Sequence, residues 1–164
     1  MNYSRINYFD IANGTGIRVS LYVSGCRNHC DGCFNPETWD FNYGQLYTMD
    51  KEKDIFDHIT DYHSGLTILG GEPFEKENID DIFYLIYRFK TTFKDKDIWI
   101  YSGYNYEYLV EKYSDILRMV DILVDGKFDI SKKDFRLKFK GSSNQRIICA
   151  SLSSKDNIIL SELN

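Results

Sequence analysis

Three of the four cysteines lie within eight consecutive residues, in the segment Cys26-Arg-Asn-His-Cys30-Asp-Gly-Cys33, and Cys149 lies far along the chain. Clustered thiols are typical of metal binding, whereas a disulfide framework would show dispersed and evenly spaced cysteines. Thiolates bind both zinc and iron–sulfur clusters, so the ligand type does not choose between them. Three cysteines on a four-iron cluster would leave one iron without a protein ligand, which is the open position that a catalytic metal centre needs.

A zinc-stabilised interaction module without catalysis is the alternative that these residues leave open. A structural zinc site needs four ligands, commonly from two clips, and the chain has no second Cys-x-x-Cys pair. Cys149 is the fourth ligand that this alternative requires, because His29 lies inside the cysteine loop, where strain makes it a poor partner. We predict that the three histidines, His29, His58 and His63, are structural or exposed.

A second group of chemically informative residues is Gly70-Gly71-Glu72-Pro73, directly after the apolar run 67–69. Glycines let backbone groups approach a ligand closely, and the Glu72 carboxylate could accept a hydrogen bond from a cationic amine. Taken alone, the same residues also fit an ordinary glycine–proline turn that leads into a helix.

Two further short polar segments follow apolar runs. They are Ser102-Gly103 after residues 98–101 and Asp125-Gly126-Lys127 after residues 122–124. Each segment fits a simple turn. Each also fits a site residue, because catalytic groups of βα barrels gather at the carboxyl ends of the strands.

The elements that must position these residues alternate along the chain. Strands are predicted at 17–23, 67–69, 98–101 and 122–124, and each ends at a glycine-containing loop. Apolar residues at helical spacing predict amphipathic helices at 50–62, 78–93 and, with a weaker pattern, 105–119. This alternation predicts an α/β fold with a mainly parallel sheet and outer helices. The tail 151–164 is a last strand, a docking segment or a frayed end.

Composition restricts the class of protein. The chain has 164 residues and a formal net charge of −5, so it has no basic face for nucleic acid, and we expect one domain over residues 1–164. No apolar run approaches the roughly 18 residues of a membrane span, and the first 15 residues lack an apolar signal core. We therefore expect a soluble, cytoplasmic protein with no membrane and no nucleic-acid partner.

The spacing Cys-x-x-x-Cys-x-x-Cys after one strand, followed by Gly-Gly-Glu-Pro after the next, resembles the radical S-adenosylmethionine superfamily. The resemblance implies that Cys26, Cys30 and Cys33 hold a [4Fe-4S] cluster whose fourth iron is chelated by the amino and carboxylate groups of S-adenosylmethionine. The cofactor-binding residues that it implies are Gly32, Cys33, Phe34, Gly70, Gly71, Glu72, Pro73, Ser102, Asp125 and Lys127. Among them, Phe34 is expected beside the adenine and Glu72 at the methionine amine.

A narrower resemblance covers residues ~5 to ~150 and points to the family that activates the anaerobic ribonucleoside-triphosphate reductase. Its segments are Asp10-Ile-Ala-Asn13-Gly14-Thr-Gly16-Ile-Arg18, Ser24-Gly25-Cys26, Asn35-Pro-Glu-Thr38-Trp39, Val124-Asp125-Gly126-Lys127-Phe128 and Gly141-Ser142-Ser143-Asn144-Gln145-Arg146. The resemblance implies an oxidoreductase that reductively cleaves S-adenosylmethionine to a 5′-deoxyadenosyl radical and generates a glycyl radical on that reductase. A flavodoxin-like protein is the implied electron donor. Activation of another glycyl-radical enzyme, of the formate-lyase type, is the nearest alternative.

The length of the chain limits the barrel that this resemblance implies. A closed eight-unit βα barrel takes about 250 residues, and six units of about 30 residues each would need about 180. We therefore predict a partial, open βα barrel of the radical S-adenosylmethionine type, whose opening admits the glycine-bearing loop of the reductase. Aromatic residues from Trp39 to Tyr43 are a candidate part of that interface.

Overall fold

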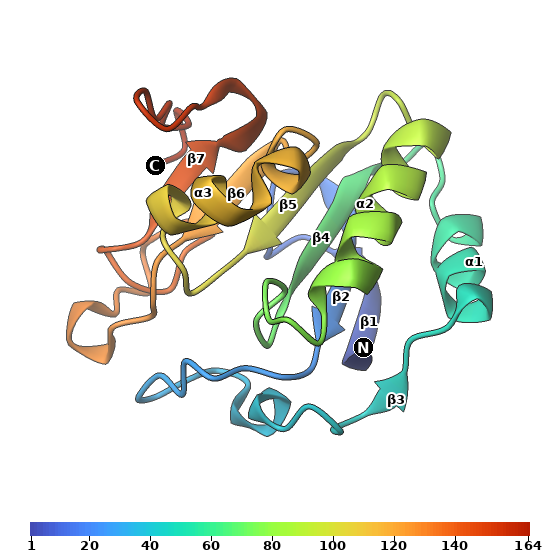
Figure 1. Ribbon diagram of the computed structural model, residues 1–164, viewed down its shortest axis with the longest axis horizontal. Helices are drawn as coiled ribbons and strands as arrows, with labels where there is room; N and C mark the ends of the chain where they lie inside the picture. Colours follow the sequence, from blue (N-terminus) through green and yellow to red (C-terminus); the bar gives the residue numbers. More distant parts are fainter.

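The computed structural model describes all 164 residues and contains one seven-stranded sheet in the order β3-β1-β2-β4-β5-β6-β7 (Figure 1). The strands are β1 (Asn2–Asp10), β2 (Ile17–Val23), β3 (Gln45–Leu46), β4 (His63–Gly70), β5 (Asp97–Tyr101), β6 (Ile122–Asp125) and β7 (Arg146–Cys149). The helices are α1 (Met49–Asp57), α2 (Ile79–Thr92) and α3 (Tyr106–Leu117), with 3-10 turns η1 (Pro36–Trp39), η2 (Ile130–Lys132) and η3 (Ala150–Leu152). None of the helices is long and apolar enough to cross a membrane.

The centre of the sheet is parallel and its edges are antiparallel. Strands β2, β4, β5 and β6 run parallel to one another, so their carboxyl ends lie at the same edge of the sheet. Strand β1 pairs antiparallel with β2 and with β3, and β7 pairs antiparallel with β6. The sheet ends at β3 on one side and at β7 on the other, so it is open. The predicted mixed α/β fold with a largely parallel sheet and outer helices is confirmed.

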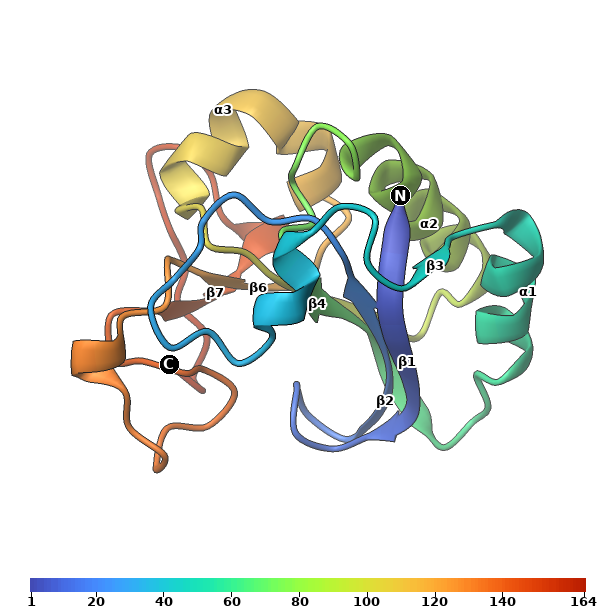
Figure 2. The ribbon, with the colours of Figure 1, turned by 90° about the horizontal axis from the view of Figure 1, so that it is seen from below.

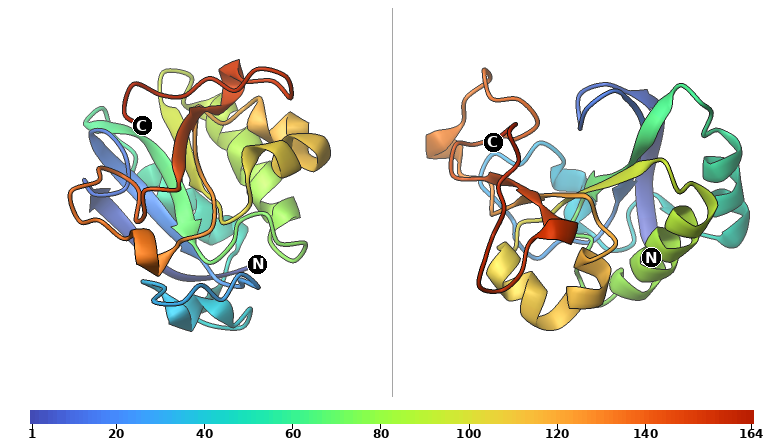
Figure 3. Two further views of the ribbon diagram at one scale, coloured as in Figure 1. Left: turned by 90° about the vertical axis from the view of Figure 1, so that its left-hand side faces the viewer. Right: turned by 90° about the horizontal axis from the view of Figure 1, so that it is seen from above.

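The three helices cover one face of the sheet, as the views from below and above show (Figures 2 and 3). Strand side chains alternate between the two faces, so Val19, Leu21 and Val23 of β2 belong to the core cluster that also contains the buried face of α2. The predicted amphipathic pattern of α2 is confirmed, since Ile82, Ile86 and Phe89 of that helix are fully buried. The hydrophobic core therefore lies between the sheet and the helices.

The opposite face of the sheet is more polar and forms the floor under the site. Arg18 of β2 is completely buried there and pairs with Asp97, while its Nε donates to Thr67 Oγ1 at 2.7 Å. The Arg18 guanidinium carbon lies 5.4 Å from the centre of the Trp99 ring. These contacts satisfy a buried cation that would otherwise be costly, and they fill the interior where no helix packs.

All four predicted strands and all three predicted helices are present; β2 has the predicted ends, and the ends of the others are shifted. Strand β4 begins at His63, four residues before the predicted start at residue 67. Helix α1 ends at Asp57, five residues before the predicted end at residue 62, and α3 is distorted at Tyr113. Strands β1, β3 and β7 were not predicted, so the cysteine loop follows the second strand of the chain and not the first. The tail contains most of η3 and takes part in two isolated bridges, Ile148 with Leu160 and Ser154 with Asn157.

Candidate functional site

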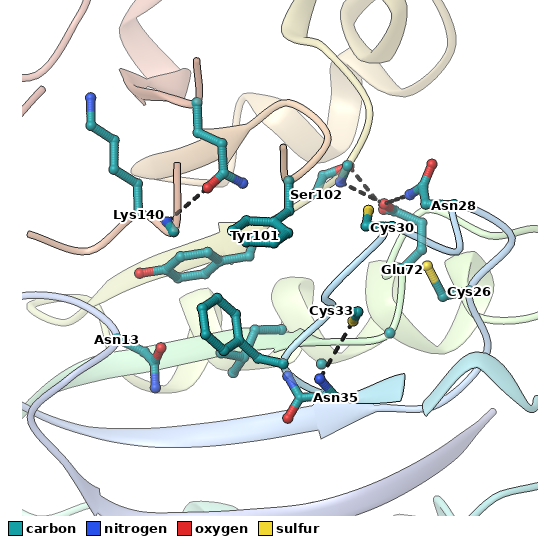
Figure 4. A pocket seen from close by; sticks show the side chains of 18 of the residues that line it. Asn13, Cys26, Asn28, Cys30, Cys33, Asn35, Glu72, Tyr101, Ser102 and Lys140 are labelled. Carbon is teal, nitrogen blue, oxygen red and sulfur yellow. Dashed lines mark hydrogen bonds between the residues drawn. The ribbon is translucent and has the colours of Figure 1, made fainter. Parts of the chain in front are cut away.

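The cysteine loop lies at the carboxyl edge of the parallel strands, over a cavity of about 490 Å³. Cys26, Cys30 and Cys33 all line this cavity, and none of them forms a disulfide. Gly70, Gly71 and Glu72 at the end of β4 and Ser102 at the end of β5 line it as well (Figure 4). The tertiary structure therefore brings the cysteine motif and the Gly-Gly-Glu motif, which are about 40 residues apart in sequence, to one place.

Glycine at position 71 is what allows these two motifs to touch. A Cβ atom there would lie 2.7 Å from the carbonyl oxygen of Gly25 and 3.1 Å from those of Thr38 and Val23. Instead, the Gly71 N–H donates to Val23 O at 2.7 Å, and the N–H of the next residue, Glu72, donates to Gly25 O at 2.9 Å. The expected close backbone approach is therefore made to the cysteine loop itself.

The start of the cysteine loop is anchored by Arg27. Its backbone N–H and guanidinium donate to the Glu75 carboxylate at 2.9 and 2.6 Å, and the guanidinium also binds Glu77 at 2.6 Å. The Arg27 guanidinium carbon lies 4.3 Å from the centre of the Phe41 ring. These contacts tie the loop to the segment that follows Glu72.

The aromatic residues after the cysteines pack under the same loop. The Trp39 and His29 rings are stacked, with centroids 4.5 Å apart, and the Cys26 N–H donates to Trp39 O at 3.2 Å. Trp39 and Phe41 are only partly exposed, whereas Tyr43 is 43% exposed. Two of the three aromatic residues that were predicted at the interface, Trp39 and Phe41, thus pack against the loop, and Tyr43 remains exposed.

Glu72 is the most connected polar residue of the site. Its side chain is 1% exposed and accepts four hydrogen bonds, from Ser102 Oγ, the Gly103 N–H, Asn28 Nδ2 and the Phe74 N–H, at 2.9, 2.7, 3.1 and 3.1 Å. Burial raises the pKa of Glu72 to about 7, against the opposing effect of these donors. A carboxylate offers about four lone-pair positions, and donors of the protein occupy all four in Glu72. These are the positions at which we expected the amine of a ligand to bind.

Burial favours the protonated form of two of the three thiols. Burial raises the pKa of Cys26 to about 11, and burial also raises the pKa of Cys30, although the charge of the nearby Lys127 acts in the opposite direction. The backbone N–H of Asn35 donates to the Cys33 sulfur at 3.4 Å. Metal binding here must displace protons, because the thiolate is the binding form.

The arrangement of the thiols distinguishes a cluster from a single ion. No three side chains of His, Cys, Asp or Glu surround one point closely enough to hold a single metal ion. Zinc would require sulfur atoms at about 2.3 Å from one centre. In a cluster each cysteine binds a different iron, so the sulfurs are more widely spaced. Three thiols around one cavity therefore fit an iron–sulfur cluster better than a structural zinc.

Cys149 does not belong to the site. It lies on β7 opposite Ile122, the first residue of β6, and therefore at the edge of the sheet away from the cysteine loop. None of the three histidines lines the cavity. His63 is buried and bonds Tyr8 O at 2.7 Å, while His29 and His58 are exposed. The fourth ligand that a zinc module requires is thus too distant.

Four residues that the resemblance placed at the cofactor do not line the cavity, namely Gly32, Pro73, Asp125 and Lys127. Asp125 is buried and turned toward Arg146, whose Nη2 and Nε donate to it at 2.5 and 3.0 Å. It also accepts the Tyr106 N–H at 2.7 Å at the start of α3. Asp125 therefore uses its acceptor positions to join α3 and β7 to β6, and its predicted contact with the cofactor stays a prediction.

Of the other three residues, Pro73 is buried directly after Glu72. Lys127 is exposed beside the cysteine loop. Gly32 has a φ of +70° and packs against Ile130, where a Cβ would lie 2.3 Å from Cδ1. Phe34, by contrast, lines the cavity at 58% exposure, with its ring centre 5.2 Å from that of Phe128.

The far half of the cavity contains residues that the sequence did not single out as site residues. Tyr101 of β5 lies between the cysteines on one side and Asn13 and Lys140 on the other (Figure 4). Its hydroxyl is buried without a hydrogen-bond partner, whereas Asn13 Nδ2 donates to Tyr22 at 3.0 Å. Tyr101 could have been found as the inward-facing residue of the strand that ends at Ser102.

Comparison with known proteins gives a consistent result. Residues 12–148 match the family model described as a 4Fe-4S single cluster domain. Three similar proteins bear the name anaerobic ribonucleoside-triphosphate reductase-activating protein. The one from enterobacteria phage T4 is 40% identical over 148 residues, which cover 90% of this chain and 93% of that protein. The ones from Vibrio cholerae serotype O1 and Haemophilus influenzae are 39% and 37% identical over 150 residues, covering 90% of this chain and 97% of each relative.

Proposed function

This chain belongs to the family of anaerobic ribonucleoside-triphosphate reductase-activating proteins, and from that membership we propose that it is a radical S-adenosylmethionine activase. Its substrate is a glycine of the anaerobic reductase. When bound, a [4Fe-4S] cluster and S-adenosylmethionine supply the chemistry, in which one electron cleaves a sulfonium C–S bond to give methionine and a 5′-deoxyadenosyl radical that takes a hydrogen atom from that glycine.

The observation that carries this proposal is the shared cavity of the three thiols and the Gly-Gly-Glu motif. Cys26, Cys30 and Cys33 would hold the cluster and leave one iron free for the cofactor. The cavity is lined by both apolar and polar groups. Its volume of about 490 Å³ lies within the usual range of small-molecule sites.

The role of Glu72 follows from its hydrogen bonds. It joins the cysteine loop, through Asn28, to the end of β5, through Ser102 and Gly103. Of its four donors only Asn28 and Ser102 are side chains, and the Asn28 contact is among the longest at 3.1 Å. We assign the amine of S-adenosylmethionine to the acceptor position that Asn28 vacates when it turns away, so Glu72 both positions the loop and binds the cofactor.

The aromatic wall would hold and shield the cofactor. Phe34 follows the third cysteine, and its exposed ring faces the cavity beside Phe128. A flat aromatic surface suits the adenine ring. An adenine stacked on this surface would also exclude water from the part of the cavity where the radical forms. Ser102 remains a candidate contact through its place on the cavity wall.

The open sheet supports the proposed substrate. We take residues 1–164 as a single radical S-adenosylmethionine domain whose sheet is a partial barrel, with the opening used by the glycine-bearing segment of the reductase. The observed edges at β3 and β7, which do not pair with each other, are consistent with such an opening. The proposal includes a flavodoxin-like electron donor and a cytoplasmic location beside the reductase.

The experiment that tests the proposal starts from protein reconstituted anaerobically with iron and sulfide. With S-adenosylmethionine and dithionite, we expect a brown protein that forms methionine and 5′-deoxyadenosine and raises a glycyl radical signal on the anaerobic reductase by electron paramagnetic resonance. A colourless protein that retains one zinc and cleaves no S-adenosylmethionine would refute the proposal. A radical on a formate-lyase-type enzyme but not on the reductase would favour the alternative substrate.

A further inference from the structure

A strongly basic segment forms part of the cavity wall and continues onto the surface beside it. Residues 127–140, here called the basic loop, contain six basic and two acidic residues and so carry a net charge of +4. The whole chain carries −5, so the other 150 residues carry −9. This segment is thus net positive, whereas the rest of the chain is net negative.

The acidic residues of the basic loop are already paired within it. Asp129 binds Lys132 at 3.0 Å, and Asp134 binds Arg136 at 2.7 Å. The lysines of the loop that form no ion pair with a carboxylate are Lys127, Lys133, Lys138 and Lys140. Four cations therefore remain available to an anionic partner.

The basic loop also exposes apolar side chains. Phe135 is 86% exposed and Ile130 is 52% exposed. The Lys133 ammonium lies 4.6 Å from the centre of the Phe135 ring and 4.8 Å from that of Phe34. Exposed aromatic rings beside unpaired cations are typical of a binding surface, because a solvated charge run needs no aromatic side chains.

The position of the basic loop connects this surface to the cavity. Leu137, Phe139 and Lys140 line the cavity wall, and Lys133 lies over Phe34 at its rim. The loop, drawn in orange, projects on the side of the sheet away from α1 and α2 (Figures 2 and 3). A polypeptide that enters the cavity along this wall must pass the unpaired lysines.

We propose that the basic loop is the docking surface for acidic side chains that flank the reacting glycine of the reductase. The inference rests on the proposed function for the identity of the partner. Opposite charges at the rim of an interface increase the association rate and fix the orientation of the incoming segment. The excess negative charge on the rest of the chain repels an acidic segment that approaches from another direction, so the loop selects the side of entry.

The test uses the charge-reversal variant R136E/K138E and a control variant, K53E/K94E, which changes the net charge equally. Arg136 has a 91% exposed side chain, Lys138 is exposed, and neither lines the cavity. Lys53 on α1 and Lys94 after α2 are exposed and lie outside the basic loop. Binding to immobilised reductase is measured directly, and radical formation is measured with dithionite as reductant.

We expect the Kd for the reductase to rise about tenfold in R136E/K138E near 0.1 M salt and less than twofold in the control. The difference should shrink to about twofold near 1 M salt, where the screening length falls from about 10 Å to about 3 Å. Cleavage of S-adenosylmethionine without reductase should be unchanged. Equal affinities of the two variants would overturn the inference, as would a defect seen only when a protein electron donor replaces dithionite. Because binding is read directly, a protein that binds the reductase but cleaves no cofactor would refute the proposed function alone.

Discussion

Replacing Asp125 with asparagine separates a scaffold role from a cofactor role. Asp125 is 1% exposed and accepts hydrogen bonds from Arg146 and from the Tyr106 N–H. The asparagine oxygen can keep the Tyr106 N–H, but its NH₂ group then faces the Nε–H of Arg146. The D125N variant therefore loses the Nε contact and the ion pair with Arg146 and keeps only a neutral acceptor for Nη2, while the cavity lining is untouched.

The size of the loss follows from the surroundings of Arg146. Breaking a buried ion pair costs about 3–5 kcal/mol when it leaves a charge unpaired. Arg146 keeps its second pair, with Glu107 at 2.8 Å, and is 31% exposed, so it is not left without a partner. Hydrogen bonds to charged groups contribute about 1.5–3 kcal/mol. We expect D125N to lower the free energy of unfolding by about 2–3 kcal/mol, or Tm by about 4–12 °C.

The assay compares anaerobic thermal unfolding, followed by circular dichroism, with the KM for S-adenosylmethionine in the cleavage reaction. E107Q is the matched control, because it removes the more exposed partner of the same arginine, and exposed pairs contribute about 0.2–1 kcal/mol. D125N should lower Tm well beyond E107Q and leave KM within about twofold of the wild-type value. A D125N protein with wild-type Tm and a KM raised tenfold or more would refute the scaffold assignment and restore Asp125 as a cofactor contact.

Four further predictions concern the cavity itself. Cys33→Ala should abolish the iron-based absorption and the cleavage of S-adenosylmethionine, whereas Cys149→Ala should retain both, because Cys33 lines the cavity and Cys149 does not. Iron analysis and cleavage assays of the two variants test this difference. Asn28→Ala frees an acceptor position on the neighbouring carboxylate, so the KM for S-adenosylmethionine should not rise, and a tenfold rise measured in steady-state assays would contradict that role. Gly71→Ala should destabilise the fold by about 1–3 kcal/mol in urea unfolding, because its Cβ would press on three backbone oxygens that cannot move away, and wild-type stability would refute the close approach. Burial raises the pKa of Glu72 in the folded state to about 7 from 4.5, so the folded state binds the carboxyl proton more tightly than the unfolded state does. The free energy of unfolding should therefore fall by about 3 kcal/mol as the pH rises from 4.5 to 7. Urea unfolding across this pH range should show the fall in the wild-type protein and not in E72Q.

The chemistry of the cysteine loop was predictable because its determinants are local. Three thiols within eight residues must lie close together in any fold. A Gly-Gly pair after an apolar run predicts a close backbone contact at the end of a strand. The parallel strands were predictable for the same reason, since each reads as a short apolar run that ends at glycine. Strand β1 was not predicted because two irregularities interrupt its pairing with β2, and because residue type does not follow burial at its end, where Phe9 is 72% exposed and Asp10 is buried.

The sequence by itself thus determined that three thiols share one loop, which family the chain resembles and that the sheet is mainly parallel. Only the tertiary structure decided which strand ends serve the site. Ser102 follows the parallel strand β5 and Asp125 is the last residue of the parallel strand β6, yet Ser102 binds Glu72 in the cavity, and Asp125 turns to Arg146 on the antiparallel strand β7. The tertiary structure also decided the position of Asn28, which donates to Glu72, 44 residues away. It likewise placed the basic loop at the cavity that the cysteines line. Spacing along a chain fixes which residues are neighbours in a loop, whereas contacts between loops depend on how the strands are ordered and packed.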